Sequence, residues 1–167
     1  MATVTFKGNP VQTVGELPRV GESAPDFTLT TTELTETSLS DYRGKTVVLN
    51  IFPSIDTPVC SMSVRKFNAE IAKKDTAVVL CISMDLPFAH SRFCGSEGLD
   101  DVVSLSAFRN RAFGDAYGIR IAEGPLNGLF ARAVVVIDGA GKVLYTELVP
   151  EIAEEPGYDA AMAAVGG

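Results

Sequence analysis

The sequence predicts an α/β fold with a central mixed β-sheet flanked by helices and a β-hairpin at the N-terminus. Short, apolar, β-branched runs indicate two buried strands, at Thr46–Phe52 and Ala77–Ser83. Between these strands, apolar residues recur with the spacing of one helix face, at Cys60, Val64, Phe67 and Ile71. Further along, the turn Asp138-Gly-Ala-Gly141 joins two more strand segments. This alternation predicts helices on both faces of the sheet, with an antiparallel hairpin at one side.

The elements of the first half follow from local signals. Thr3–Phe6 and Val11–Thr13 alternate around Lys7-Gly8-Asn9-Pro10, which predicts the N-terminal hairpin. A turn-rich stretch leads to a strand at Phe27–Thr30, and the polar residues 31–38 are either loop or a short strand. Thr57 and Pro58 predict the start of the helix that follows the first core strand, because threonine is favoured at the N-cap and proline at the first helical position. This helix is expected to continue to about Lys74.

The second half continues the alternation. We expect a helix over Pro87–Glu97, ended by Gly98, and a short strand at Val102–Leu105. Ala107–Tyr117 is expected to be partly helical and Gly118–Gly128 irregular. Two paired strands follow at Ala133–Ile137 and Val143–Glu147, and a C-terminal helix at Tyr158–Val165. No repeat or linker divides the chain, so we expect residues 1–167 to form a single domain.

Composition and charge narrow the function. The formal net charge of −7 disfavours nucleic acid and anionic membrane surfaces as partners, because both would repel the chain. No apolar run approaches the roughly 20 residues of a membrane span. Residues 1–10 lack a basic region followed by an apolar core, so we expect no secretory signal and a cytoplasmic location.

The cysteine count points to redox chemistry rather than to a disulfide scaffold. The chain has three cysteines, Cys60, Cys81 and Cys94, and an odd, small number suits a reducing compartment in which any disulfide is transient and catalytic. The single histidine, His90, leaves little room for histidine-based acid–base chemistry or for a metal site. The sequence contains no phosphate loop or dinucleotide fingerprint. We therefore expect neither a cofactor nor a bound metal.

The setting of Cys60 predicts a reactive thiol. If the helix begins at Pro58, Cys60 occupies the third helical position, among unpaired backbone N–H groups at the positive end of the helix dipole. That environment stabilises a thiolate, which is the reactive form of cysteine. The alternative is an inert cysteine on an apolar helix face. Cys81, inside the strand Ala77–Ser83, is instead expected to act as a small buried hydrophobe.

These residues resemble a known family. Pro53-x-x-x-Thr57-x-x-Cys60 on a strand-to-helix turn resembles the motif of the peroxiredoxins, as does Gly21-x-x-Ala24-Pro25-x-Phe27-x-Leu29. More narrowly, the chain is similar to the atypical two-cysteine thiol peroxidases of bacteria. This similarity runs from about Val4 to Tyr158 and rests on the segments Asn50–Thr57, Arg65–Asn68, Asp85–Ala89, Ser91–Gly95 and Ala131–Ile137.

The resemblance implies a thioredoxin-like fold, reduction of hydrogen peroxide and organic hydroperoxides, thioredoxin as electron donor, and a homodimer. It makes Cys60 the peroxidatic nucleophile, which becomes a sulfenic acid, and Cys94 the resolving cysteine. It places the Thr57 hydroxyl, besides its capping role, within reach of the sulfur and a peroxide oxygen. It assigns Pro53 to shielding the thiolate, and Arg132 to stabilising the thiolate and donating to the peroxide.

Several alternatives stay open at this point. Arg132 could be a solvated charge at the start of a strand, and His90 is more often a surface or helix-cap residue than a ligand. Four apolar side chains could line a site for bulky hydroperoxides or belong to the core: Ile55, Leu86, Phe88 and Phe93. Because a disulfide needs Cα atoms within roughly 7 Å, Cys60 and Cys94 can pair only if the fold and local rearrangement allow it.

Two other functions compete with the peroxidase. A thioredoxin-like disulfide reductase is disfavoured, because Thr57 lies three residues before Cys60 and Ser63 three residues after it, where such an enzyme has a second cysteine. A non-catalytic peroxide sensor or binding module on the same fold would react only stoichiometrically.

Overall fold

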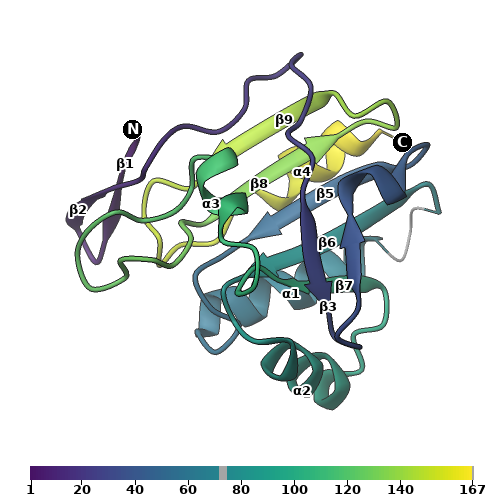
Figure 1. The fold of residues 1–167 in the computed structure, drawn as a ribbon, viewed down its shortest axis with the longest axis horizontal. Helices are drawn as coiled ribbons and strands as arrows, with labels where there is room; N and C mark the ends of the chain where they lie inside the picture. The colour runs from purple at the N-terminus through teal and green to yellow at the C-terminus, as the bar shows by residue number, and fades with distance from the viewer. Residues whose placement is uncertain (72–74, 167) are drawn as a thin grey trace.

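The computed structural model describes residues 1–71 and 75–166. Within these residues the centre is a seven-stranded mixed sheet with the strand order β4-β3-β7-β6-β5-β8-β9 (Figure 1). The strands are β3 (Thr28–Thr31), β4 (Glu36–Ser38), β5 (Thr46–Ile51), β6 (Ala77–Ser83), β7 (Val102–Ser106), β8 (Ala133–Ile137) and β9 (Val143–Leu148). Strands β5, β6 and β7 are parallel, and the outer pairs are antiparallel. The predicted mixed sheet is confirmed.

Helices cover both faces of this sheet, as predicted. They are the 3₁₀ helix η1 (Leu39–Tyr42) and the α-helices α1 (Pro58–Ile71), α2 (Pro87–Glu97), α3 (Ala112–Ala116) and α4 (Tyr158–Val165). One apolar cluster joins α1, α2 and α4 to residues such as Val79 and Val134, and a second joins α3 and η1 to Leu80 and Val135 on the opposite face. Alternating side chains of β6 and β8 thus fill two cores.

The N-terminal hairpin, β1 (Thr3–Phe6) with β2 (Asn9–Gln12), lies beside one end of the sheet (Figure 1). Its turn is only Lys7 and Gly8, with φ of 52° and 81°, the left-handed pair that a two-residue hairpin turn requires. The prediction that Asn9 and Pro10 belong to the turn is wrong. Pro10 pairs with Thr5 in an edge strand, where a missing N–H is tolerated.

Other boundaries differ modestly from the prediction. Residues 31–38 include the short strand β4, and the helix expected within Ala107–Tyr117 is limited to α3. Before α3, the Asn110 side chain donates to the Thr28 carbonyl oxygen at 2.8 Å, which holds that segment against β3 as a loop. The bounds of α2 and α4 are confirmed. The predicted continuation of α1 to Lys74 and the side chain of Ile71 lie outside the described residues.

No helix in the described part of the chain combines the length and the apolar character needed to cross a membrane.

Candidate active site

The loop that joins β5 to α1 places Cys60, in the first turn of α1, beyond the C-terminal end of the central strand β5. Helix α1 begins at Pro58 as predicted, and the Thr57 carbonyl oxygen accepts the N–H of Ser61 at 3.0 Å. Cys60 is therefore the third helical residue. Thr57 occupies the N-cap position as predicted, and its hydroxyl donates backwards to the Ser54 carbonyl oxygen at 2.9 Å, which fastens the loop before the helix.

Arg132 meets Cys60 in the interior. Strand β8 runs antiparallel to β5 with Ala133 opposite Ile51, so Arg132 lies beside the start of the Cys60 loop. Its Nη2 donates to the Cys60 sulfur at 3.1 Å, and the two residues are only 2% and 0% exposed. Arg132 is therefore not the solvated surface charge that its position in the sequence allowed.

The guanidinium of Arg132 keeps one donor unused. Its Nε donates to the Ile152 carbonyl oxygen at 2.8 Å, while Nη1 is buried and has no hydrogen-bond partner among the residues that the structure describes. A buried unpaired donor costs free energy, and such groups are rare unless a ligand or water completes them. Nη1 is thus available to an acceptor atom that enters beside Cys60.

A cavity of about 310 Å³ opens beside Arg132. Pro53, which is buried, contributes to its lining together with Ser54 and Thr57. Much of the remaining lining is apolar and comes from four separate segments, through Phe6, Pro58, Val59, Leu126, Leu129 and Ile152. The cavity could therefore hold a small polar group at Arg132 and an apolar group farther out.

The four apolar residues considered from the sequence are not part of this described lining. Ile55 is buried, and the half-buried Phe93 packs against the apolar cluster that joins α1, α2 and α4. Leu86 and Phe88 are exposed and line a different groove at the start of α2. The sequence predicted Pro53, Thr57 and Arg132 at the site but not much of the apolar lining. Phe6, Leu126, Leu129 and Ile152 contribute to that lining and lie outside the motifs.

Glu151 fixes the hairpin against the cavity. Its carboxylate accepts hydrogen bonds from the backbone N–H groups of Ala153 (2.9 Å), Gly8 (2.8 Å) and Lys7 (3.2 Å) and from the Thr5 hydroxyl (3.1 Å). These donors, led by Ala153 and Gly8, lower the pKa of Glu151 from 4.5 to about 2.

Cys94 lies on α2, half-buried, and its sulfur is 3.3 Å from the Ser104 hydroxyl. Burial raises the pKa of this thiol, and the contact with Ser104 opposes the rise. Cys94 lines a second hollow of about 410 Å³ together with Thr31, Asp100 and other residues that the Arg132 cavity does not share. All three cysteines are free thiols.

Cys81 is confirmed as a buried residue of a central strand. It is 0% exposed in β6, and burial raises the pKa of its thiol from 9.0 to about 12. The side-chain amide of Asn50 lies 3.7 Å from its sulfur. Cys81 therefore stays protonated at neutral pH and is no nucleophile.

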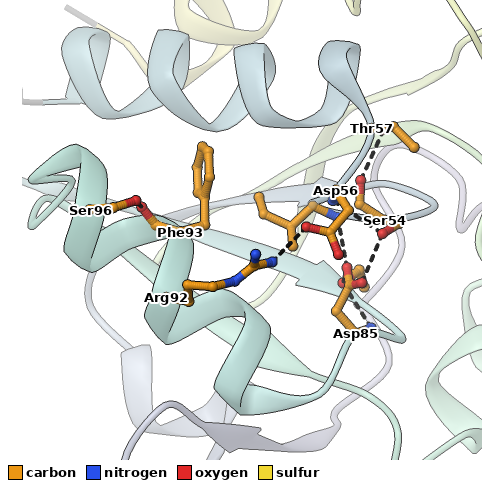
Figure 2. Close-up of polar contacts among 9 residues, drawn as sticks. Ser54, Asp56, Thr57, Asp85, Arg92, Phe93 and Ser96 are labelled. Atoms are coloured by element: carbon orange, nitrogen blue, oxygen red, sulfur yellow. Dashed lines mark hydrogen bonds and ion pairs between the residues drawn. The ribbon is translucent and has the colours of Figure 1, made fainter.

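Asp85 connects the Cys60 loop to the segment before α2 (Figure 2). One carboxylate oxygen accepts from the Ser54 hydroxyl at 2.8 Å. The other accepts from the Ile55 N–H at 2.7 Å and from the Ser83 hydroxyl at 2.5 Å. In the sequence, Asp85 was identified only as part of the family-like segment Asp85–Ala89, without a role of its own. A usable signal existed, because polar residues that follow adjacent parallel strands such as β5 and β6 meet at one sheet edge.

His90 is a buried residue of α2, and the prediction of a surface or cap position is wrong. Its Nε2 lies 3.0 Å from the Ser83 hydroxyl, whose single hydrogen is already donated to Asp85, so Nε2 carries the proton. Nδ1 is buried and has no hydrogen-bond partner within the described part of the chain. Burial lowers the pKa of His90 from 6.5 to about 4, although the nearby Asp85 and Asp56 oppose this shift. His90 is neutral at pH 7.

These features define a class of protein: a thiol-based oxidoreductase with a reactive cysteine at a helix start on a mixed α/β sheet. Within the described residues, no group of three His, Cys, Asp or Glu side chains is arranged to hold a metal ion.

Comparisons with known proteins agree with this class. The model of the redoxin family matches residues 19–162. Thiol peroxidases from Mycobacterium tuberculosis and Corynebacterium glutamicum are 59% and 54% identical, each over 99% of both chains. The crystal structure of a peroxiredoxin-like protein from Aquifex aeolicus matches with a TM-score of 0.94 and 44% identity, over 99% of this chain and 96% of that one.

The chain therefore belongs to the redoxin family, among its thiol peroxidases. The predicted thioredoxin-like peroxiredoxin fold and the thiol-dependent peroxidase activity are confirmed at this level. Its substrate is a peroxide and its reductant a thiol.

Proposed function

We propose that the chain reduces hydrogen peroxide and organic hydroperoxides through Cys60, forms a Cys60–Cys94 disulfide, and is reduced again by thioredoxin. The observation that carries this proposal is the buried contact between Arg132 and the Cys60 sulfur. Nη1 of the same guanidinium lies beside a cavity and is not paired with any described residue. A sulfur and a free cationic donor side by side suit attack on an O–O bond.

In the first step the Cys60 thiolate attacks one peroxide oxygen. The O–O bond breaks, a sulfenic acid forms at Cys60, and the other oxygen leaves as an alkoxide or hydroxide that takes up a proton. Arg132 Nη1 donates to the oxygens as charge develops. The Cys60 backbone N–H is a further donor. Thr57 lines the cavity, and its hydroxyl joins the donors once it releases its hydrogen bond to the Ser54 carbonyl oxygen, while the buried Pro53 shields the thiolate from water. The apolar walls favour organic hydroperoxides over hydrogen peroxide alone.

In the second step the Cys94 thiol attacks the Cys60 sulfenic acid, a disulfide forms and water leaves. Both cysteines border the apolar cluster beneath α1, yet both are free thiols here. We infer that the first turn of α1 and the Cys94 part of α2 loosen so that the sulfurs can bond. Thioredoxin then exchanges its dithiol for this disulfide, in the reducing cytoplasm that three unpaired cysteines suit.

The decisive experiment follows peroxide consumption with thioredoxin, thioredoxin reductase and NADPH. Cys60→Ser should abolish turnover while the fold survives, and Cys81→Ser should leave turnover largely intact. Cys94→Ser should be oxidised once but not recycled by thioredoxin. Turnover by the Cys60 mutant at more than a few per cent of wild type would sink the assignment. Stoichiometric oxidation without turnover of the wild type would instead indicate a sensor, and disulfide reduction without peroxide consumption a disulfide reductase.

Peptide mapping without reductant identifies the disulfide. After one equivalent of peroxide, the expected link is Cys60–Cys94 within one chain, and a Cys60–Cys60 or Cys60–Cys81 link would contradict it. Hydrogen exchange should rise in both segments on oxidation. Equal exchange in the two redox states would count against the loosening.

We also propose a homodimer. Exposed apolar side chains gather around one groove that is lined by the β3–β4 turn, the start of α2 and the segment between β7 and α3, namely Leu34, Leu86, Phe88 and Phe108. Such a patch is typical of a surface that another protein covers, and a second copy of this chain is the proposed occupant. Sedimentation of the wild type should give a dimer and sedimentation of Phe88→Glu a monomer. A monomeric wild type would contradict the proposal.

A further inference from the structure

The two segments that must rearrange for disulfide formation are fastened to each other. The Asp85 carboxylate accepts hydrogen bonds from Ser54 and Ile55 of the Cys60 loop at 2.8 and 2.7 Å. Asp85 itself lies directly before α2, the helix that carries Cys94. One carboxylate thus joins the loop before α1 to the segment before α2.

The Ser83 hydroxyl extends this connection to the inner face of α2. It donates to Asp85 at 2.5 Å and accepts from the Asp85 N–H at 3.1 Å and from His90 Nε2 at 3.0 Å. Its one hydrogen and both lone pairs are therefore used. Since His90 lies one helical turn before Cys94, the network reaches the turn of α2 that must loosen.

A second contact between the same segments serves as an internal comparison. Arg92 of α2 pairs with Asp56 of the Cys60 loop at 2.7 Å (Figure 2). Both side chains are mostly exposed, at 66% and 64%, so solvent screens this pair. The Asp85 network is instead largely enclosed, because Ser83 and His90 are both 0% exposed.

We propose that Asp85 is a positioning residue that holds the Cys60 loop and the Cys94 helix in the peroxide-reactive arrangement, and that its release sets the rate of Cys60–Cys94 disulfide formation. This inference rests on the proposed two-cysteine mechanism. Hydrogen bonds to a carboxylate are strong, and those of Asp85 are enclosed, whereas solvent screens the exposed Arg92–Asp56 pair. The Asp85 contacts therefore contribute more than the surface pair to holding the segments together.

The consequence concerns the fate of the sulfenic acid. It either reacts with the Cys94 thiol, giving a disulfide and water, or with a second hydroperoxide, giving a sulfinic acid and an alcohol. The longer Asp85 holds the segments together, the larger is the share of the second reaction. Asp85 would thus speed the reaction of Cys60 with peroxide but also increase its over-oxidation to sulfinic acid.

The test separates the two steps in Asp85→Ala. Reduced protein is mixed with cumene hydroperoxide and quenched at intervals, and mass spectrometry quantifies thiol, sulfenic acid, disulfide and sulfinic acid at Cys60. We expect disulfide formation about tenfold faster, as for the loss of one strong hydrogen bond, with a slower peroxide step and less sulfinic acid in excess peroxide. A purely structural role would not accelerate the second step.

Two controls define the result. Asp56→Asn breaks only the exposed pair between the same segments and should resolve at nearly the wild-type rate. Phe113→Leu weakens the core on the opposite sheet face, where Phe113 is 2% exposed, and should lower stability without faster resolution. Resolution by Asp85→Ala at or below the wild-type rate, or equal acceleration in Phe113→Leu, would overturn the proposal.

If Asp85→Ala does not fold, Asp85→Asn decides the question. It keeps the shape of the side chain but replaces one acceptor oxygen with a donor, so we expect a smaller acceleration of disulfide formation. An unchanged rate of disulfide formation counts against the proposed role of Asp85. A wild type that forms no Cys60–Cys94 disulfide would contradict the two-cysteine mechanism itself, and is recognised before any variant is compared.

Discussion

Among single residues, Arg132 has the most specific arrangement, because its three nitrogens have three different surroundings. Nε donates to the Ile152 carbonyl oxygen, Nη2 donates to the Cys60 sulfur, and Nη1 is buried with no partner in residues 1–71 and 75–166. The fixed Nε contact orients the planar guanidinium, so that the two Nη groups point to fixed places. Such a donor can stabilise a transition state without reorganising during the reaction.

Simple arithmetic shows that ionisation of a thiol cannot explain a fast peroxidase. A thiol with a pKa near 8.5 is about 3% ionised at pH 7, and one with a pKa near 6 is about 90% ionised. This roughly 30-fold gain is largely offset, because nucleophilicity falls with basicity and loses roughly 10- to 20-fold over the same range. Most of the rate must come from donors that act on the peroxide oxygens.

We therefore predict that Arg132→Met slows the reaction with peroxide at least about 100-fold even near pH 9, a loss of about 2.7 kcal/mol, comparable to removing one oxyanion-type donor. At that pH an ordinary thiol is mostly ionised without help. Stopped-flow measurement of the reduced protein against pH tests this.

Arg132→Lys is the graded comparison. It should recover only part of the rate, because an ammonium cannot contact Ile152, Cys60 and a peroxide with one planar fork. If Arg132→Met returned to within a few-fold of wild type at high pH, Arg132 would act only on ionisation of the thiol.

For single residues, the sequence predicted which secondary-structure element a residue lies in better than it predicted which residues it contacts. The positions of Cys60 and Cys81 followed from helix-start signals and strand composition, both of which are local. The pairing of Cys60 with Arg132 came only from family resemblance, since no spacing rule links residues 72 positions apart. The burial of His90 depends on tertiary contacts, which the residue itself does not signal.

Among the elements, the N-terminal hairpin is the one whose placement affects the site most directly. Phe6 and Lys7 at its turn line the Arg132 cavity, and the Glu151 carboxylate holds that turn by its backbone. Because the folded state lowers the pKa of Glu151 from 4.5 to about 2, this anchoring is complete above pH 4.5 and is lost as the pH falls towards 2.

We predict that Glu151→Ala impairs reduction of a bulky hydroperoxide about tenfold more than reduction of hydrogen peroxide, because a loosened hairpin removes apolar wall but not the Cys60–Arg132 pair. The measurement is kcat/KM for cumene hydroperoxide and for hydrogen peroxide.

Glu154→Gln provides the matched control, since Glu154 is an exposed neighbour on the same segment. It should keep the wild-type ratio of the two kcat/KM values. An equal loss for both peroxides in Glu151→Ala would show that the hairpin does not select by size.

The elements themselves were predicted well where their signals are local. The bounds of α2 and α4 were correct, helped in α2 by Pro87 at its start and by Gly98, whose φ of 66° suits the helix end. The segment before α3 was not predictable, because a long-range contact between Asn110 and Thr28 decides it. The predicted hairpin turn is two residues too long, because Asn9 and Pro10 pair with β1 as part of an edge strand.

For the whole molecule, His90 links stability to pH. Folding lowers the pKa of His90 from 6.5 to about 4, so the unfolded chain binds the extra proton more readily than the folded one. Stability is therefore full above pH 6.5 and is lost as the pH falls from 6.5 towards 4. The chain has one histidine, and ordinary carboxylates titrate mainly below this range.

We predict that the free energy of unfolding falls by about 2 kcal/mol between pH 7.5 and pH 5. Urea unfolding followed by circular dichroism measures it. His90→Gln, which cannot titrate, should have a lower stability at pH 7.5 but a nearly flat profile over the same range. Equal slopes in the two proteins would show that His90 is not the group responsible.

The two separate hollows have a consequence for how the two substrates compete. The cavity at Arg132 and the hollow at Cys94 share none of the lining residues that the structure describes. Under the proposed two-cysteine mechanism, oxidant and reductant would therefore approach the molecule by different routes. Enzymes that alternate between two substrates at one shared opening are inhibited when either substrate is in excess, because it blocks the form meant for the other. With two openings, a high concentration of reductant need not obstruct the oxidant. The same chain could then work at full rate in a cell whose thiol pool far exceeds its peroxide.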